Sequence, residues 1–311
     1  MQNIYEAQTT NKRKSLMIVL LFLSFVFVAI YFLGQGMAVN LGYQPGGLST
    51  VGLALIISGL ISFGSYYYSD KIVLTISGAK KADRRRDFNF YTVAENLSLA
   101  CGLPKPSLYV INDSAPNAFA TGRNPQKAIV CVTSGLLDKL SRSELEGVIA
   151  HELSHIKNYD MLLMSLVAVM VGSLALLGDW FLRVRWLASR HNDSDNREGQ
   201  FAVIFMLVGL IFALLSPLIA RLIQLAISRR REFMADAGSV LITKQPSGLI
   251  SALEKIATDK EILEAANKAT AHLYIINPFK KRGMGVIGRF AGLFNTHPPT
   301  AERIKTLRQM E

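Results

Sequence analysis

The feature that most constrains this chain is a long stretch without a charged residue or a histidine, from Ser15 to Ser69. Two apolar blocks lie within it, Ser15–Leu33 and Leu48–Tyr68, and each approaches the roughly 20 helical residues that span a bilayer. The segment between them, Gly34–Gly47, is rich in glycine and contains Pro45. The pattern predicts two membrane-spanning helices joined by a short outer loop. Their apolar length exceeds the core of a cleavable signal peptide.

Composition and the placement of charge support a membrane protein. Half of the chain is hydrophobic and only 18% is charged, below the roughly 25% of a typical soluble protein. The net charge of +11 comes from basic residues beside the apolar blocks, which predicts contact with the lipid bilayer and argues against nucleic acid as a partner. Basic residues flank the first hairpin on both sides, and its loop contains none. The positive-inside rule therefore places the N-terminus and the segment after Asp70 in the cytoplasm. These residues are Lys12, Arg13, Lys14, Lys71, Lys80, Lys81, Arg84, Arg85 and Arg86.

Two further apolar stretches, Met161–Gly178 and Phe201–Ala220, are also uncharged. If both cross the membrane, the loop between them is external and carries Arg183, Arg185, Arg190 and Arg197, which opposes the positive-inside rule. The alternative is a hairpin that enters the membrane without fully crossing it. The sequence therefore predicts two firm spans and two probable ones.

The remaining segments have the patterns of a folded α+β region. Leu108–Ile111 and Ala128–Val132 are short, β-rich apolar runs bounded by turn residues, so they are predicted to be strands. Asn117–Thr121 is predicted to be a third strand, at the edge of the sheet. Between Ser247 and Glu311, helical periodicity places Leu249, Leu253 and Ile256 on one apolar face.

His151, Glu152 and His155 form an H-E-x-x-H motif, which indicates a catalytic metal site. Residues four apart share a helical face, so both imidazoles can bind one metal ion. Ser141 and Glu144 form a capping box that predicts the start of this helix, which is expected to run on towards Met161. Zinc suits two imidazoles and a carboxylate. Glu152 can take a proton from the attacking water and later pass it to the leaving amine.

A third ligand must come from another segment, and Glu232 is the best candidate. The motif alone occurs by chance in roughly three per thousand such chains, and its alternative is an amphipathic helix with two surface histidines. For Glu232, the alternative is a solvated carboxylate that neutralises the three preceding arginines. A ligand role is favoured because antiparallel helices in the last two apolar stretches would bring His155 and Glu232 to one membrane face, each within about 10 Å of it.

Asp236 lies four residues after Glu232 and shares its helical face. A zinc-bound histidine usually donates its free ring N–H to a carboxylate, so Asp236 is predicted to accept this bond from His151. The alternative is an ordinary surface aspartate.

These motifs together resemble the HtpX-type membrane zinc peptidases, which are relatives of the CAAX prenyl endopeptidases. The resemblance rests on the H-E-x-x-H motif, Ser228–Asp236, Pro116–Gly122, Thr296–Thr300 and the Arg303-Ile304 pair, and it extends over nearly the whole chain. It implies an α-helical membrane protein with a gluzincin-like α+β peptidase domain that binds one zinc ion per chain through His151, His155 and Glu232. It also implies that Glu152 is catalytic.

The resemblance further implies an endopeptidase that cleaves misfolded or damaged membrane proteins in the inner membrane, as part of quality control under stress. It makes Asn117, Ala118, Phe119, Ala120 and Thr121 the candidate substrate-binding strand, because an edge strand offers backbone groups to an extended peptide. An ordinary strand is the alternative.

His297 is a candidate donor to the oxyanion of the tetrahedral intermediate. The alternative for its segment is a simple helix entry in which Thr300 caps the C-terminal helix.

Three other classes of protein remain as alternatives. A CAAX-type prenyl endopeptidase would carry about seven spans by that same resemblance, more than are visible here. A non-enzymatic membrane scaffold is disfavoured by the intact Glu152. A transporter would need ionisable residues at membrane depth, where Arg221 is the sole candidate.

The predicted organisation has five parts. They are a cytoplasmic N-terminus (1–14), a transmembrane hairpin (15–69), a cytoplasmic catalytic region (70–160), a second membrane hairpin (161–228) and a second cytoplasmic catalytic region (229–311).

Overall fold

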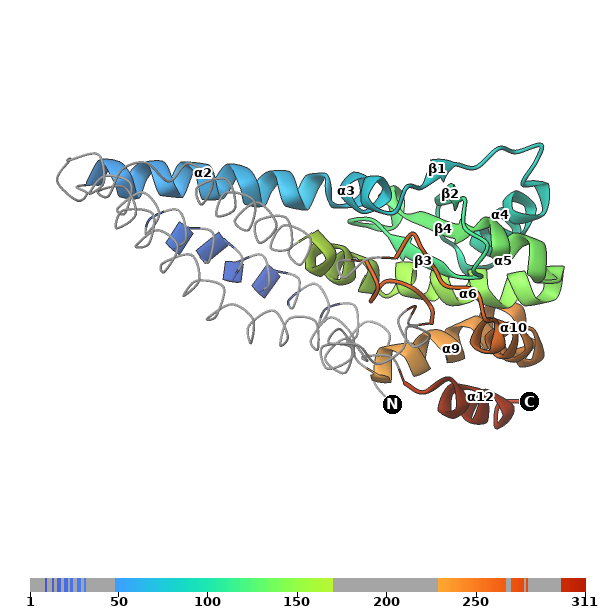
Figure 1. Ribbon diagram of the computed structural model, residues 1–311. Helices are drawn as coiled ribbons and strands as arrows, with labels where there is room; N and C mark the ends of the chain where they lie inside the picture. Colours follow the sequence, from blue (N-terminus) through green and yellow to red (C-terminus); the bar gives the residue numbers. More distant parts are fainter. Residues whose placement is uncertain are drawn as a thin grey trace, which may run out of the picture.

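The computed structural model describes residues 48–169, 229–266, 270–276, 278 and 298–311, with isolated positions before residue 32. Within these ranges a small sheet lies among helices, and α2 projects from this part as a long rod (Figure 1). The elements in chain order are α2 (Leu48–Tyr67), α3 (Ser69–Ile76), β1 (Lys80–Lys81), α4 (Phe88–Cys101), β2 (Ser107–Ile111), β3 (Ala118–Thr121), the 3-10 helix η1 (Pro125–Lys127), β4 (Ile129–Thr133), α5 (Ser134–Lys139), α6 (Arg142–Lys157), α9 (Arg229–Thr243), α10 (Pro246–Thr258) and α12 (Thr300–Arg308).

The sheet has the strand order β1-β2-β4-β3. Strands β2 and β4 are parallel, and β1 and β3 each run antiparallel to their neighbour. The two predicted apolar strands are confirmed as β2 and β4, and β3 forms at the sheet edge within the Asn117–Thr121 segment, as predicted. Strand β1 is missing from the prediction, because Lys80 and Lys81 lack the apolar, β-branched character that signals a strand.

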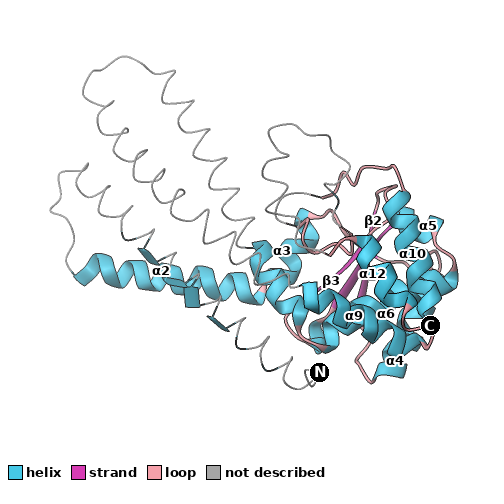
Figure 2. Cartoon of the chain, turned by 90° about the horizontal axis from the view of Figure 1, so that it is seen from below, coloured by secondary structure: helices cyan, strands magenta, loops and turns pink. Residues whose placement is uncertain are grey.

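Helix α6, which carries the H-E-x-x-H motif, begins as the sequence predicts. Ser141 is its N-cap: the Ser141 Oγ accepts a hydrogen bond from the Glu144 N–H, and the Glu144 carboxylate accepts one from the Ser141 N–H at 2.7 Å. The helix packs against β3, α4, α9 and α10, and Figure 2 shows it inside the helical part of the molecule. Because α6 is enclosed on several sides, its polar side chains must find partners within the protein.

α6 ends at Lys157, so the prediction that this helix runs on towards Met161 is wrong. Asn158 and Tyr159 form a turn in which Tyr159 has a left-handed φ of 60°, and residues 160–169 are helical again. A non-glycine residue in this conformation is uncommon and must be held by its surroundings. The turn brings the Asp160 carboxylate back to α6, 3.1 Å from the Nδ1 atom of His155.

For the C-terminal helices, the predicted apolar face is confirmed and the alternative in which Thr300 caps the last helix is wrong. Leu249, Leu253 and Ile256 are all buried on α10, which confirms the predicted apolar face. Thr300 does not cap α12, because the helix already includes it and the N-cap is Pro299, without a side-chain cap. The Pro299 carbonyl accepts the first N–H groups of the helix, which places the helix start one residue earlier than predicted.

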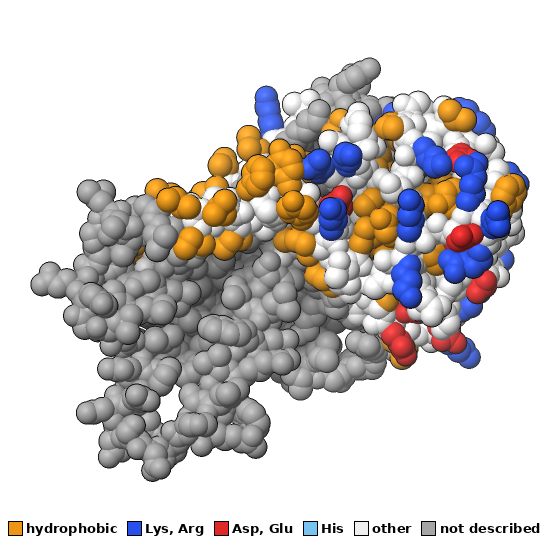
Figure 3. Space-filling model, turned by 90° about the horizontal axis from the view of Figure 1, so that it is seen from above, with side chains coloured by type: hydrophobic (Ala, Val, Ile, Leu, Met, Phe, Trp, Pro, Cys, Tyr) orange, Lys and Arg blue, Asp and Glu red, His pale blue; other side chains and the backbone are white. Residues whose placement is uncertain are grey.

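Helix α2 covers the second predicted span and exposes many large apolar side chains. They lie along the rod in Figure 3 and include Leu55, Ile56, Leu60, Ile61, Phe63 and Tyr67. Among the helices of the described ranges, none combines the length and apolar character that a full bilayer crossing requires. The other predicted spans lie outside the described residues, apart from the isolated positions of the first and residues 161–169 of the third.

Candidate metal centre

The three predicted metal ligands converge between α6 and α9. The Nε2 atoms of His151 and His155 are 3.2 Å apart, and the Glu232 carboxylate oxygens lie 3.8 Å and 3.6 Å from them, respectively. Zinc bound tetrahedrally at about 2.0–2.2 Å sets its ligand atoms about 3.4 Å apart, so this cluster fits a zinc ion. Glu232 is 1% exposed, which excludes the alternative of a solvated carboxylate.

Each histidine has a carboxylate behind its other ring nitrogen. His151 Nδ1 lies 3.0 Å from Asp236 Oδ1, and His155 Nδ1 lies 3.1 Å from Asp160 Oδ2. An ionised carboxylate only accepts hydrogen bonds, so these partners assign the proton of each neutral ring to Nδ1. Both Nε2 atoms then turn lone pairs towards each other, and two lone pairs this close repel unless a cation lies between them. The donor set therefore fits a metal ion.

The two histidines differ in their pKa values, because the charges around them differ. Burial alone would lower the pKa of His155, but the hydrogen bond to Asp160 and the charge of Glu232 outweigh burial and raise the pKa to about 9. Burial lowers the pKa of His151 to about 4, despite its hydrogen bond to Asp236. A metal ion binds neutral imidazoles, so metal binding competes with protonation of His155.

Glu152 is buried beside the ligand pair, with 2% of its surface exposed. Burial is the largest cause that raises its pKa, to about 7, and the negative charge of Glu232 adds to it. The charge of His155 and a hydrogen bond with the Ala120 backbone of β3 oppose the rise. The carboxyl group therefore lies between the metal ligands and the edge strand, with a pKa suited to proton transfer near neutral pH.

Asp236 makes the predicted contact with His151, and its complete burial excludes the alternative of a surface aspartate. Two further charged residues have no role in the sequence prediction. Asp160 pairs with His155. The sequence feature that could have pointed to this role is a carboxylate that follows the second histidine within two helical turns. Arg303 of α12 lies behind Asp236, with 2.6 Å between Nη2 and Oδ1, and no spacing rule points to it.

The outer side of β3 is partly occupied by residues 270–276. The Ile275 N–H donates to the Ala118 carbonyl at 2.9 Å, and the Asn117 side-chain amide donates to the Ile276 carbonyl at 3.0 Å. Alternate residues of an edge strand turn their backbone groups outward, so Ala118 and Ala120 share this side. The segment therefore already uses one acceptor of the predicted substrate strand. His297 lies outside the described residues.

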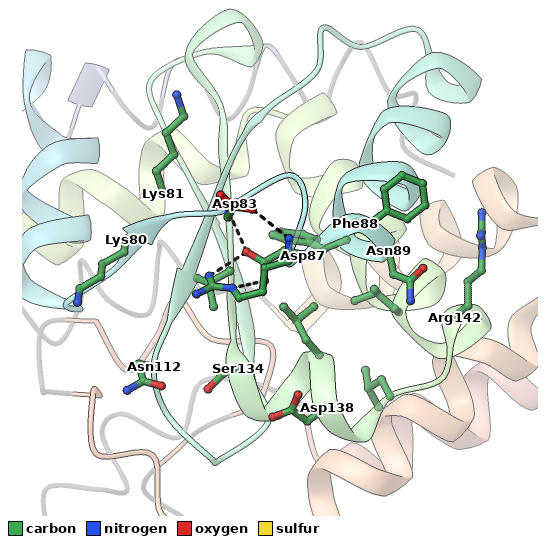
Figure 4. A pocket seen from close by; sticks show the side chains of 16 residues that line it. Lys80, Lys81, Asp83, Asp87, Phe88, Asn89, Asn112, Ser134, Asp138 and Arg142 are labelled. Carbon is green, nitrogen blue, oxygen red and sulfur yellow. Dashed lines mark hydrogen bonds and ion pairs between the residues drawn. The ribbon is translucent and has the colours of Figure 1, made fainter.

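A separate cavity of about 810 Å³ lies at the other edge of the sheet, beside β1 (Figure 4). Its walls include Lys80, Lys81, Asp138 and Arg142, and the Asp87 carboxylate in its floor is paired with Arg86 at 2.9 Å. None of the metal ligands lines it. The Lys80, Lys81, Asp138 and Arg142 side chains at this cavity are exposed to solvent.

A buried H-E-x-x-H helix with a glutamate from a second helix beside both histidines is the donor set of a zinc metallopeptidase. Residues 84–311 match the model of Peptidase family M48. Because this match covers most of the chain, the protein belongs to peptidase family M48 and is a metalloendopeptidase with His151, His155 and Glu232 as its candidate zinc site.

Comparison with individual proteins narrows the group to the HtpX type. The chain is 40% identical over 309 residues to a protease HtpX homolog of Caldanaerobacter subterraneus subsp. tengcongensis, covering 99% of this chain and 98% of the relative. It is 42% identical over 306 residues to a protease HtpX homolog of Dictyoglomus turgidum, covering 98% and 94%. Among solved structures, the crystal structure of S. mikatae Ste24p matches with a TM-score of 0.48 and 18% identity, covering 97% of this chain and 67% of that one.

Proposed function

We propose that this zinc metallopeptidase is a multi-pass protein of the inner membrane that cleaves misfolded or damaged membrane proteins from the cytoplasmic side. The observation that carries the proposed chemistry is the buried Glu152, adjacent in sequence to one zinc ligand and hydrogen-bonded to the strand on which substrate would bind.

In this proposal Glu152 is the proton carrier. Zinc, when held by His151, His155 and Glu232, would act as a Lewis acid and lower the pKa of water. Glu152 accepts the proton of the attacking water and donates it to the departing amine. Burial favours the protonated form of this carboxyl group, so Glu152 can hold the proton between the two steps.

Strand β3 supplies the proposed substrate-binding edge. An extended peptide would pair with the outward backbone groups near Ala120, which places its carbonyl beside Glu152 and requires no particular side chains. Backbone pairing of this kind favours unfolded segments of many sequences, as quality control requires. Asn117, Phe119 and Thr121 would hold the strand against the core, where they are all buried.

His297 would donate a hydrogen bond to the oxyanion of the tetrahedral intermediate. It lies six residues before the buried Arg303 in the sequence. The cytoplasmic, membrane-bound location is supported by the Lys and Arg residues that follow α2 and by the apolar side chains exposed along it. Cytoplasmic loops and partly extracted spans would therefore be the preferred substrates.

The test is proteolysis of an unfolded model protein by the full chain purified in detergent. Wild type with zinc is expected to cleave, whereas wild type with chelator is not. Glu152→Gln with zinc should lose about 10²- to 10⁴-fold in kcat while still binding one zinc ion. Glu146→Gln is the matched control, since Glu146 lies on the same helix but is paired with Arg142 outside the site.

Cleavage by Glu152→Gln at the wild-type rate would refute the role of Glu152 as base. For location, a model substrate in intact cells should be cut in its cytoplasmic loops. Efficient cleavage confined to loops on the other side of the membrane would contradict the proposed orientation.

A further inference from the structure

Arg303 lies buried behind the metal ligands and takes no part in the proposed proton transfer. It is 1% exposed and ranks first in volume among the fully buried side chains of the described residues. Its Nε and Nη2 atoms donate to the two oxygens of Asp236 at 2.9 Å and 2.6 Å, and its Nη1 donates to the Ile275 carbonyl at 2.9 Å. One side chain of α12 thus joins α9 to the segment that lies along β3.

The same guanidinium group also reaches the metal ligands. Nη1 lies 3.4 Å from Oε2 of Glu232, and Nη2 lies 3.4 Å from Nδ1 of His151. Arg303 therefore lies beside two of the ligands and is also paired with Asp236, which supports His151.

This geometry fixes the orientation of the carboxylate. A guanidinium fork is planar and binds a carboxylate through two parallel N–H bonds, so both oxygens of Asp236 are set in one plane. Oδ1 then lies where it accepts the proton of His151 Nδ1, at 3.0 Å. The guanidinium group has only N–H donors and no acceptor atom, so Arg303 cannot accept that proton itself. The Nε2 lone pair of His151 is left free for a metal.

We propose that Arg303 is a positioning residue for the zinc site, which holds Asp236 and Glu232 in the orientations that let His151 and Glu232 bind the metal together. The proposal rests on the proposed function only in taking zinc as the ion. Arg303 acts through these neighbours and not on substrate, because it is buried and its three kinds of N–H group face Asp236, Ile275 and Glu232.

Electrostatics and positioning predict opposite results when Arg303 is removed. A positive charge this close to the site repels a zinc ion, so loss of the charge alone would tighten zinc binding. Loss of orientation would weaken it, because changes in the groups that support metal ligands typically cost about 10- to 100-fold in affinity. The sign of the change therefore separates the two effects.

The experiment measures zinc affinity by chelator competition on the full chain in detergent. Arg303→Met is expected to bind zinc about 10- to 100-fold more weakly than wild type. Arg303→Lys, which keeps the charge but not the fork, should recover only part of the loss. Cobalt substitution provides a second readout, because displaced ligands alter the visible absorption of the bound ion.

The matched control is Leu307→Ala, because Leu307 is fully buried on the same helix and packs in the hydrophobic core. It should lower thermal stability and leave zinc affinity unchanged. Unchanged or tighter zinc binding in Arg303→Met would overturn the proposal, and so would an equal loss of affinity in Leu307→Ala.

If Arg303→Met does not fold, Arg303→Lys decides the question, and wild-type affinity and cobalt spectrum in that variant would refute positioning. Zinc affinity is independent of proteolysis, so this outcome is distinguishable from a failure of the proposed function. In the active enzyme, the Lys variant is expected to lower kcat with little change in KM.

Discussion

His151 and His155 direct the same nitrogen to the same point, yet they are supported by different regions of the chain. His155 is held by Asp160, five residues further on, which lies 3.7 Å from Arg231. His151 is held by Asp236 of α9, and Asp236 by Arg303 of α12. One half of the site is thus mostly local, and the other is assembled from three helices. The two histidines of one five-residue motif therefore depend on supports that differ in their sensitivity to change.

The largest expected effect comes from neutralising the two supporting carboxylates, one at a time. Asp236→Asn removes the two hydrogen bonds that pair the buried Arg303 with a carboxylate, so the free energy of unfolding should fall by about 3–5 kcal/mol. Asp160→Asn should cost about 1.5–3 kcal/mol, because Arg231 is less tightly paired. Both values are measured by denaturant unfolding with chelator present, which removes the contribution of zinc. Equal losses would show that the two supports are equivalent.

A smaller effect is expected where the two halves of the site touch. A Cβ atom added at Gly238 of α9 would lie 2.3 Å from Ser154 Oγ and 3.0 Å from Ser154 Cβ of α6. Gly238→Ala should therefore cost about 1–3 kcal/mol by overpacking. Ser154→Gly removes the obstruction, so the double variant should be no less stable than Ser154→Gly alone.

The control for this contact is Gly59→Ala in α2, where an added Cβ meets no atom within 4 Å. Alanine is the better helix former, so this variant should lose no stability. A double variant with the sum of both single losses would show that Gly238 and Ser154 are not coupled.

The smallest effect is expected at the start of α6, which Glu144 ties to α10. Burial alone would raise the pKa of Glu144, but the bonds donated by Lys255, Ser251 and the Ser141 backbone lower it to about 2. Glu144→Gln should cost about 1–2 kcal/mol at neutral pH. Because the folded-state pKa is depressed, this stability is present above the pKa of the unfolded chain and is lost as the pH falls.

The unfolding midpoints of wild type and Glu144→Gln should therefore converge between about pH 5 and pH 2. Both are measured with chelator, and the exposed Glu146→Gln provides the baseline. A gap between the two proteins that stays constant over this range would contradict the role of the Glu144 charge.

The sequence predicts those elements of the fold and site that depend on residues close together in the chain. The capping box, strands β2, β3 and β4, and both histidines follow from local patterns. Glu232 is predicted from the antiparallel arrangement expected of the last two apolar stretches, and Asp236 from its spacing to Glu232 within one helix. The turn at Tyr159 was unpredictable because it depends on a left-handed residue without glycine, and it brings Asp160 to His155.

Arg303 and residues 270–276 could not be predicted for a different reason. A polar helix with a single buried arginine has the same periodicity as one with a solvated arginine, so burial is decided by partners on distant elements. The bond from Ile275 to Ala118 likewise joins segments that no local pattern relates.

The long sequence separation between α6 and α12 also determines when the site can form. During synthesis, domains fold from the N-terminus onwards, and α6 leaves the ribosome well before α9 and α12. A nascent chain that displays both histidines still lacks Glu232, Asp236 and Arg303, so it has neither the full ligand set nor its support. The site can therefore be completed only after translation has passed Arg303.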